Sequence, residues 1–290
     1  MSFLVRLASL ILSVIVIPLS GVTYCLDLFS ANDRQDTSQV NIVGLGAYFR
    51  SQGITCDGES LYFSSKTTLV KTESDARTIE AENYSAIPKE LAEKYGIKHI
   101  GGLSYYNGRI YAGMEDSKVW NYPTVGVFDA NSLELAEYYI LDMKTTDENG
   151  EERLAVSRGL PWVAVDPTSG LLYCTDHSKQ PEKLLVFDTA DSMKYVKEIP
   201  LDFSIPSIQG AEFLGGVLYA ATNDDTQAIY RIDVDTGKTC KIIDRNLTRG
   251  SEGEGMTFAV KNGETKLIAI DLGPMFINAI VRQYDMEDIG

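Results

Sequence analysis

Short stretches of alternating apolar and polar residues, separated by tight turns, fill most of this chain. Residues 209–244 show the pattern most clearly, with turns at Gly215-Gly216 and Gly237 and a polar loop after Thr222. Alternation with a period of two, bounded by glycine-containing turns, indicates short antiparallel strands joined by hairpins. One such four-stranded sheet cannot bury both of its faces, so the pattern predicts further copies of the same unit.

The sequence contains five copies. A second strand follows a turn that ends in glycine in each of them, namely ESLYFSS, RIYAG, LLYCT, VLYAAT and TKLIAI. A short strand precedes each turn, namely QGITC, GGLSY, PWVAV, QGAEF and EGMTF. Third strands recur in all five units, but the last unit has no fourth strand, and a matching segment lies instead at residues 41–49. We therefore predict an all-β fold, a single β-propeller of five four-stranded blades whose ring is closed by this N-terminal strand.

Two insertions interrupt the repeat. Residues 77–98 contain PKELAEKYG, which predicts a short helix that begins at Pro88, and residues 143–157 are polar and rich in acidic side chains. Both insertions are expected on loops between blades. Such loops either carry a functional site or are surface additions without a function of their own.

The N-terminus differs from the rest of the chain. Residues 1–26 carry one charge, Arg6, before an apolar run at residues 7–26, which is long enough to span a bilayer and also resembles a signal peptide. We expect a signal peptide or a signal anchor at 1–26, a polar linker at 27–38 and the propeller at 39–290. The propeller would then be extracytoplasmic, either secreted or tethered to the membrane by residues 7–26.

Charge and cysteine content narrow the class of partner. The chain of 290 residues has a net charge of −15, which argues against nucleic acid and against an anionic membrane surface. The expected partner is an extracellular ligand (a peptide, a glycan or a protein), with the membrane involved only through the N-terminal segment, and the protein is expected to be a monomer. Cys56, Cys174 and Cys240 form no disulfide framework and are expected to be small buried hydrophobes.

Candidate site residues follow from the repeat, because the innermost strands of a propeller run beside its central channel. Gln52, Gln209 and Glu254 start three of these strands, and His99 and Glu252 lie close by, so these five are candidate ligand-binding residues. Oxygen ligands from several blades suit Ca²⁺, which makes Ca²⁺ a candidate cofactor with Glu254, Asn223 and Asp176 as candidate metal ligands. The alternative is that these side chains form hydrogen bonds with turns and channel water.

Two families of propellers resemble the chain. The pattern QGIT…DG…LY, followed by VGVFDANSLEL and YRIDVDTGK, resembles the five-bladed propellers of the glutaminyl cyclotransferase type, and Gln52-Gly53 matches their opening Gln-Gly. Glu254-Gly255 looks like the opening Glu-Gly of lactonase and gluconolactonase-like propellers, in which Asn223 or Asp176 would stand for further metal ligands. These resemblances imply an enzyme with its site at the central channel.

Two classes of function follow from these observations. The first is an exported propeller that acts as a ligand- or protein-binding module. The second is an enzyme, either a metal-dependent hydrolase of the lactonase or esterase type or a glutaminyl cyclotransferase-like enzyme. An enzyme needs convergent carboxylates with shifted pKa values, and Glu254 is the one acid among the residues that start the five innermost strands. The sequence therefore favours the binding module.

Overall fold

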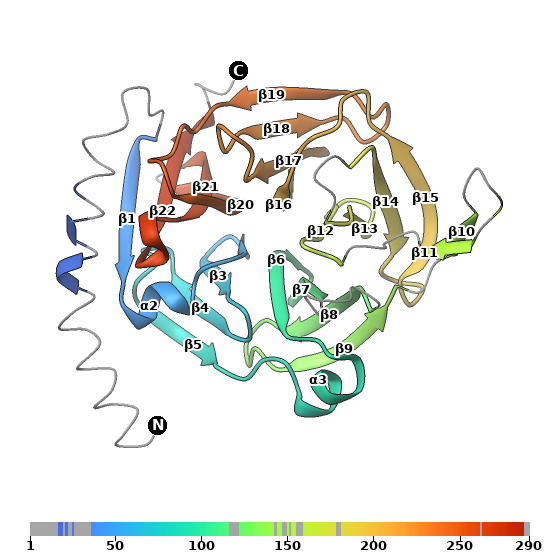
Figure 1. Cartoon of the computed structure of the whole chain (residues 1–290), viewed down its shortest axis with the longest axis horizontal. Helices are drawn as coiled ribbons and strands as arrows, with labels where there is room; N and C mark the ends of the chain where they lie inside the picture. Colours follow the sequence, from blue (N-terminus) through green and yellow to red (C-terminus); the bar gives the residue numbers. More distant parts are fainter. Residues whose placement is uncertain are drawn as a thin grey trace.

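The computed structural model describes residues 36–115, 122–141, 159–177, 181–261 and 263–286, with shorter pieces at 17–19, 21, 22, 25, 144–146, 150 and 152–154. Within these residues, five four-stranded antiparallel sheets form the blades of a ring, as Figure 1 shows. The prediction of a single all-β propeller with five blades is confirmed.

Each blade is a meander whose first strand is innermost. Blade 1 consists of β2 (Ile54–Cys56), β3 (Ser60–Ser64), β4 (Leu69–Glu73) and β5 (Ile79–Asn83). Blade 2 consists of β6 (His99–Tyr106), β7 (Arg109–Glu115), β8 (Thr124–Asp129) and β9 (Leu135–Ile140). Blade 3 consists of β12 (Ala164–Val165), β13 (Leu171–Cys174), β14 (Lys183–Asp188) and β15 (Lys194–Pro200). Blade 4 consists of β16 (Ile208–Leu214), β17 (Val217–Thr222), β18 (Ile229–Ile232) and β19 (Thr239–Ile243).

Blade 5 is assembled from both ends of the described chain. It contains β20 (Glu252–Lys261), β21 (Glu264–Leu272) and β22 (Asn278–Asp285), and its outer strand is β1 (Ser38–Val43). β1 pairs with β22 from Ser38↔Gln283 to Val43↔Asn278, which confirms closure by an N-terminal strand. The predicted bounds of that strand, 41–49, were wrong. β1 ends at Val43, because Gly44 has a φ of 65° and starts the short helix α2 (Leu45–Tyr48).

The ring has two faces with different loops. On the hairpin face lie the tight turns between the first and second strands, such as Gly215-Gly216 in blade 4. The opposite face, called the loop face here, carries the connections from one blade to the next and the loops that leave the second strands. On the loop face lie α2, the predicted helix α3 (Lys89–Tyr95) and the 3₁₀ turn η1 (Pro274–Phe276). A small hairpin of β10 (Lys144–Thr146) and β11 (Glu152–Leu154) falls in the second predicted insertion, whose other residues lie largely outside the described ones.

The hydrophobic core is divided among the interfaces between neighbouring blades. One cluster contains Trp162 and Phe213 and joins blades 3 and 4, while another contains Ile110, Phe128 and Leu91 of α3 and joins blades 1 and 2. Three similar clusters join the remaining pairs of blades. The outer strands are half-exposed, so apolar and polar residues alternate in strands such as β5, whereas strands nearer the channel, such as β3, are buried on both faces.

The expectation for the cysteines is confirmed in part, and the expected leader and linker stay predictions. Cys174 is buried as predicted, but Cys56 is half-buried and Cys240 is exposed on the outer strand β19 because outer strands turn one face to solvent. Among the residues that the structure describes, no helix is long and apolar enough to span a membrane. Most of the predicted leader at 7–26 and of the linker at 27–38 lies outside the described residues.

Candidate functional site

One inner segment of each blade lines the channel, and equivalent residues of the five segments form successive layers. The segments are residues 52–56, 101–105, 161–165, 209–213 and 254–258. Their first residues start on the loop face, and their second residues, four of which are glycines, form a tight belt. A Cβ atom on Gly53 would lie 2.9 Å from the Cα of Gly102, and one on Gly210 would lie 2.7 Å from the Cα of Gly255. Glycine is required at these positions because the backbones of different blades are in direct contact.

The glycine belt separates the polar groups of the loop face from those of the hairpin face. The pairing of the first and second strands shifts at the same level in blades 2, 4 and 5, between Ile100 and Leu103, Ile208 and Gly210, and Gly253 and Met256. Such irregularities redirect the backbone next to functional sites. Here they place the residues of the loop face at the mouth of the channel.

A chain of polar side chains from three blades crosses this mouth. The side-chain Nε2 of Gln52 donates to the carbonyl oxygen of Ser51 at 2.7 Å, so Gln52 Oε1 is the atom that accepts from Nε2 of His99, also at 2.7 Å. The other ring nitrogen of His99 lies 3.4 Å from Oε1 of Glu115, and Nδ1 of His177 lies 3.8 Å from the same oxygen. The mouth therefore holds a connected series from Gln52 to His177.

The carboxyl group of Glu115 is held ionised. Burial acts to raise its pKa, but the hydrogen bonds and charges of His177 and His99 outweigh burial and lower the pKa to about 2. In return, the interaction with Glu115 raises the pKa of His177 against the opposing effect of burial. Oε2 of Glu115 is buried and has no hydrogen-bond partner among the described residues. One oxygen of this carboxyl group thus has unused acceptor capacity with respect to the described residues.

Glu254 has the opposite electrostatic environment. Its side chain is buried, and burial, reinforced by the charges of Glu252 and Asp271, raises its pKa well above the ordinary value although Arg245 acts to lower it. Oε1 of Glu254 lies 3.4 Å from Nε2 of Gln52. Gln52 is therefore placed between a carboxyl group with a raised pKa and, through His99, a carboxyl group with a lowered pKa.

The structure brings some of the predicted residues together and separates others. Gln52, His99 and Glu254 are in contact at one mouth, and Glu252 acts on Glu254 through its charge. Asn223 lies beside blade 5, where its side-chain oxygen accepts from the backbone N–H of Gly253 at 3.1 Å. Asp176 lies on the other side of the mouth, directly before His177, which is close to Glu115. Gln209 lies at the shifted pairing of blade 4, and its backbone oxygen faces Gly102.

The predicted calcium site stays a prediction. Among the described residues, no group of three or more His, Cys, Asp or Glu side chains is arranged to hold a metal ion. The side-chain oxygen of Gln52, one of the candidate oxygens, lies at hydrogen-bond distance from His99. The oxygen of Asn223 is likewise engaged by the backbone of Gly253.

The sequence analysis missed Glu212, although the inner segments show the signal that would have found it. The fourth residues of these segments are Thr55, Ser104, Ala164, Glu212 and Thr257. Four of them are small and one is a glutamate, whose carboxyl group accepts from Thr55 Oγ1 at 2.8 Å and from Ser104 Oγ at 3.2 Å. An acid that replaces a small residue at one position of a repeat indicates a buried, specialised carboxyl group.

Three comparisons with known proteins gave one partial family match, no curated relative and several similar solved structures. A family model described as "Repeat of unknown function (DUF6923)" matches residues 145–280. A search of curated proteins found no match. Among solved structures, the chain is similar to Sqt1 of Saccharomyces cerevisiae at 11% identity and a TM-score of 0.41, covering 79% of this chain and 56% of that one.

Two further structures show a similar degree of likeness. Hydrazine synthase of Kuenenia stuttgartiensis is 12% identical with a TM-score of 0.44, covering 81% of this chain and 66% of that one. The WD40 repeats of RRP9 are 12% identical with a TM-score of 0.42, covering 82% of this chain and 62% of that one. The chain thus spans roughly three-fifths of the length of these structures. The resemblance to glutaminyl cyclotransferases and lactonases stays a prediction.

Proposed function

We propose that this propeller is an extracytoplasmic binding module that docks a protein partner on its loop face. The observation that carries the proposal is the gathering of exposed large hydrophobic side chains on the loops of this face. They are Tyr48 (60% exposed), Tyr84 (41%), Tyr122 (39%), Phe203 (55%), Met275 (72%) and Phe276 (57%). Exposed aromatic and methionine side chains of this kind are typical of protein interfaces.

These side chains come from loops around most of the ring. Tyr48 follows β1, Tyr84 follows β5, and Phe203 follows β15, so three connections between blades contribute. The ring of Tyr84 packs against Phe49 at 4.6 Å between centroids, and Tyr122 packs against Tyr95 at 5.1 Å. Neighbouring aromatic side chains of limited flexibility supply contact area at a low cost in conformational entropy.

The turn η1 supports the same interpretation. Met275 and Phe276 have φ values of 66° and 57°, a backbone region that bulky side chains rarely adopt. The strain is not explained by burial, because both side chains are exposed. Strained residues that present apolar side chains to solvent are consistent with a contact surface.

The polar mouth lies at the centre of this face and defines what the partner should present there. Glu115 offers a buried carboxylate oxygen without a partner among the described residues, and the chain as a whole carries a net charge of −15. A hydrogen-bond donor or cationic group of the partner would complement that mouth, while its apolar residues cover the surrounding aromatic side chains. The extracytoplasmic location rests on the sequence of the N-terminal segment alone.

Site-specific photo-crosslinking in the cells that make the protein tests the proposal. A photoreactive amino acid at Phe203 or at Phe276 should give the same discrete adduct, and one at Tyr195 or Val196, which are exposed on the outer strand β15, should give none. With the photoreactive amino acid placed at Tyr48 instead, the double substitution Phe203→Ser and Phe276→Ser should reduce recovery of the crosslinked partner about tenfold or more, since an apolar anchor of an interface costs about 2 kcal/mol or more when it is truncated. Equal adducts from the loop face and from β15 would overturn the proposal.

Hydrolysis at the same mouth is the second candidate function. It is favoured by one observation, the presence on either side of Gln52 of two carboxyl groups whose pKa values are shifted in opposite directions, raised for Glu254 and lowered for Glu115. Glu254→Gln distinguishes the two functions. It should abolish the hydrolysis of simple esters and lactones if the mouth is catalytic, and it should leave crosslinking at Phe203 unchanged if the protein is a binding module.

A further inference from the structure

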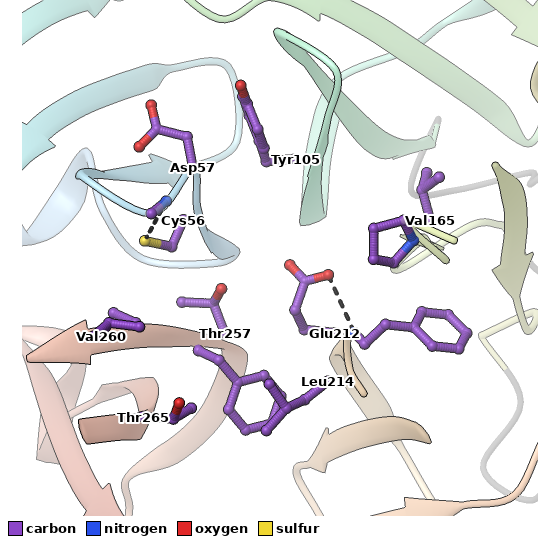
Figure 2. Close-up of a pocket in the computed structure, with 14 residues that line it drawn as sticks. Cys56, Asp57, Tyr105, Val165, Glu212, Leu214, Thr257, Val260 and Thr265 are labelled. Carbon is purple, nitrogen blue, oxygen red and sulfur yellow. Dashed lines mark hydrogen bonds between the residues drawn. The ribbon is translucent and has the colours of Figure 1, made fainter. Parts of the chain in front are cut away.

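The hairpin face contains a pocket that is separate from the loop-face mouth. It has a volume of about 310 Å³ and is lined by residues from all five blades. The fifth residues of the inner segments make much of its wall, namely Cys56, Tyr105, Val165, Phe213 and Phe258. Figure 2 shows these walls around the Glu212 carboxyl group, with Tyr105 and Asp57 on one side and Leu214 and Val260 on the other.

Glu212 lies at the floor of the pocket as an acceptor. The hydroxyl of Thr55 accepts from the backbone N–H of Tyr105 at 2.9 Å and therefore points its own proton at Glu212. The hydroxyl of Ser104 likewise accepts from the N–H of Val165 at 3.0 Å and donates to Glu212. Because the edges of two neighbouring inner strands fix both hydroxyls, the floor is preorganised to surround a negative charge.

The charges that line the pocket have one sign. Its acidic residues are Glu212 and Asp57, and its lining includes neither a lysine nor an arginine. The remaining walls are largely apolar and include the rings of Tyr105, Phe213 and Phe258, whose faces attract organic cations. When Glu212 is ionised, an anion would meet repulsion here, and a neutral apolar ligand would leave the buried carboxylate without a counter-charge.

We propose that this pocket binds a small primary ammonium ion on a short apolar body, with the charge against Glu212 and the body between the aromatic walls. The volume is at the lower end of the range for ligand pockets, so it suits a small amine or a single side chain and not a larger molecule. The ammonium group could belong to a free amine or to a lysine side chain of a polypeptide. These are two sources of the same chemistry.

The protonation of the lining groups gives the binding a defined pH dependence. Burial raises the pKa of Glu212 to about 7, although its hydrogen bonds act to lower it. Burial also raises the pKa of the Cys56 thiol to about 11, and the hydrogen bonds from Ser60, Tyr62 and Glu59 outweigh burial and lower the pKa of Asp57. Glu212 is therefore the lining group that changes charge between pH 6 and pH 8, and the amine should bind when Glu212 is ionised.

Isothermal titration of the purified full chain tests this proposal directly. At pH 8, 2-phenylethylamine should bind at least tenfold more tightly than 2-phenylethanol, which has a similar shape and no charge. The affinity for the amine should fall about tenfold from pH 8 to pH 6, because protonation of a carboxyl group with a pKa of about 7 removes the counter-charge. N-acetyl-lysine amide in a parallel titration identifies the source, since a preference for it indicates a polypeptide lysine and a preference for phenylethylamine indicates a free amine.

Three variants make the result specific. Glu212→Gln should weaken binding of the amine at least tenfold and leave the alcohol unchanged, while Glu59→Gln, which removes an exposed charge outside the pocket on the same face, should change neither. Val260→Trp fills the rim of the pocket at a side chain that is 61% exposed, so it should block the amine without affecting the fold. Equal affinities for amine and alcohol, or binding that survives both Glu212→Gln and Val260→Trp, would overturn the proposal.

Discussion

Through two arginines, the carboxylate of Asp271 connects four other segments of the ring: the loop after β19, β17, β22 and β1. Its carboxylate accepts from Nη1 of Arg245, which follows β19 of blade 4, and from Nε of Arg282 in β22 at 2.9 Å. Arg245 also donates to the backbone oxygen of Thr222 at 3.0 Å, and Arg282 donates to Gln39 of β1 at 2.8 Å. All three charged side chains are buried, so each depends on the others to compensate for lost hydration.

We expect Asp271→Ala to be among the most destabilising single substitutions in the propeller. It would remove the carboxylate that pairs with both buried guanidinium groups, of which Arg282 keeps a second ion pair with Asp36 at 3.6 Å, and breaking a buried pair typically costs about 3–5 kcal/mol. The matched control is Asp191→Ala, which removes one partner of an exposed ion pair with Lys194 and should cost little. Urea unfolding at pH 7 measures both, and similar midpoints for the two variants would contradict this account.

The strand β1 is the element on which ring closure depends. It pairs along six residues with β22, and Ile42 is buried in the cluster between blades 5 and 1. A chain that begins at Ser51 would lose this strand, expose the edge of β22 and open that cluster, so it should unfold at a much lower temperature or aggregate. A chain that begins at Asp36 keeps β1 and should unfold at the same temperature as the full-length protein.

Addition of a synthetic peptide of residues 36–50 provides a further control. It should restore the melting temperature of the shortened chain, because the missing contacts are those of a single strand. If the chains that begin at Ser51 and Asp36 melted at the same temperature, β1 would contribute nothing to closure.

The strands of this fold were predictable from the sequence because each carries its own local signal. Gly215-Gly216 in a hairpin and the alternation around β18 specify strand and turn without reference to the rest of the chain. α2 was not predicted, because GLGAYF has the apolar content of a strand. Its conformation depends on how the two neighbouring blades are connected, which the local sequence does not show. After β1 the chain must pass from the outer edge of blade 5 to the innermost strand of blade 1, and the positive φ of Gly44 and the burial of Ala47 allow this change of direction.

The candidate site was predictable only in part. Gln52 and Glu254 start inner strands, so the repeat alone places them at the channel. The link from His99 to Glu115 and His177 joins blades 2 and 3, and it depends on how neighbouring blades pack, which no local pattern encodes. The opposite pKa shifts of Glu115 and Glu254 likewise arise from burial and from neighbours that are distant in sequence.

At the scale of the whole molecule, the buried acids give the propeller an unusual dependence on pH. Glu115 has a pKa lowered to about 2, so its contribution to stability is present above the pKa of the unfolded chain, about 4.5, and is lost as the pH falls towards 2. Glu212 has a pKa raised to about 7, so the folded state holds a proton that the unfolded state has released, and stability falls as the pH rises from about 4.5 to 7. The raised pKa values of Glu254 and His177 act in the same direction as that of Glu212.

We therefore expect the free energy of unfolding to be greatest near pH 5 and to decrease towards both pH 3 and pH 8. The shift at Glu212 alone corresponds to a difference of about 2–3 kcal/mol between pH 5 and pH 8, since each unit of pKa shift is worth about 1.4 kcal/mol. Urea unfolding at pH 3, 5 and 8 measures the profile. Glu212→Gln should reduce the decrease between pH 5 and pH 8, to which Glu254 and His177 also contribute, and Glu115→Gln should reduce the decrease between pH 5 and pH 3. A wild-type protein that is as stable at pH 8 as at pH 5 would show that Glu212 is not held protonated by burial, and it would also remove the reason to expect amine binding to strengthen between pH 6 and pH 8.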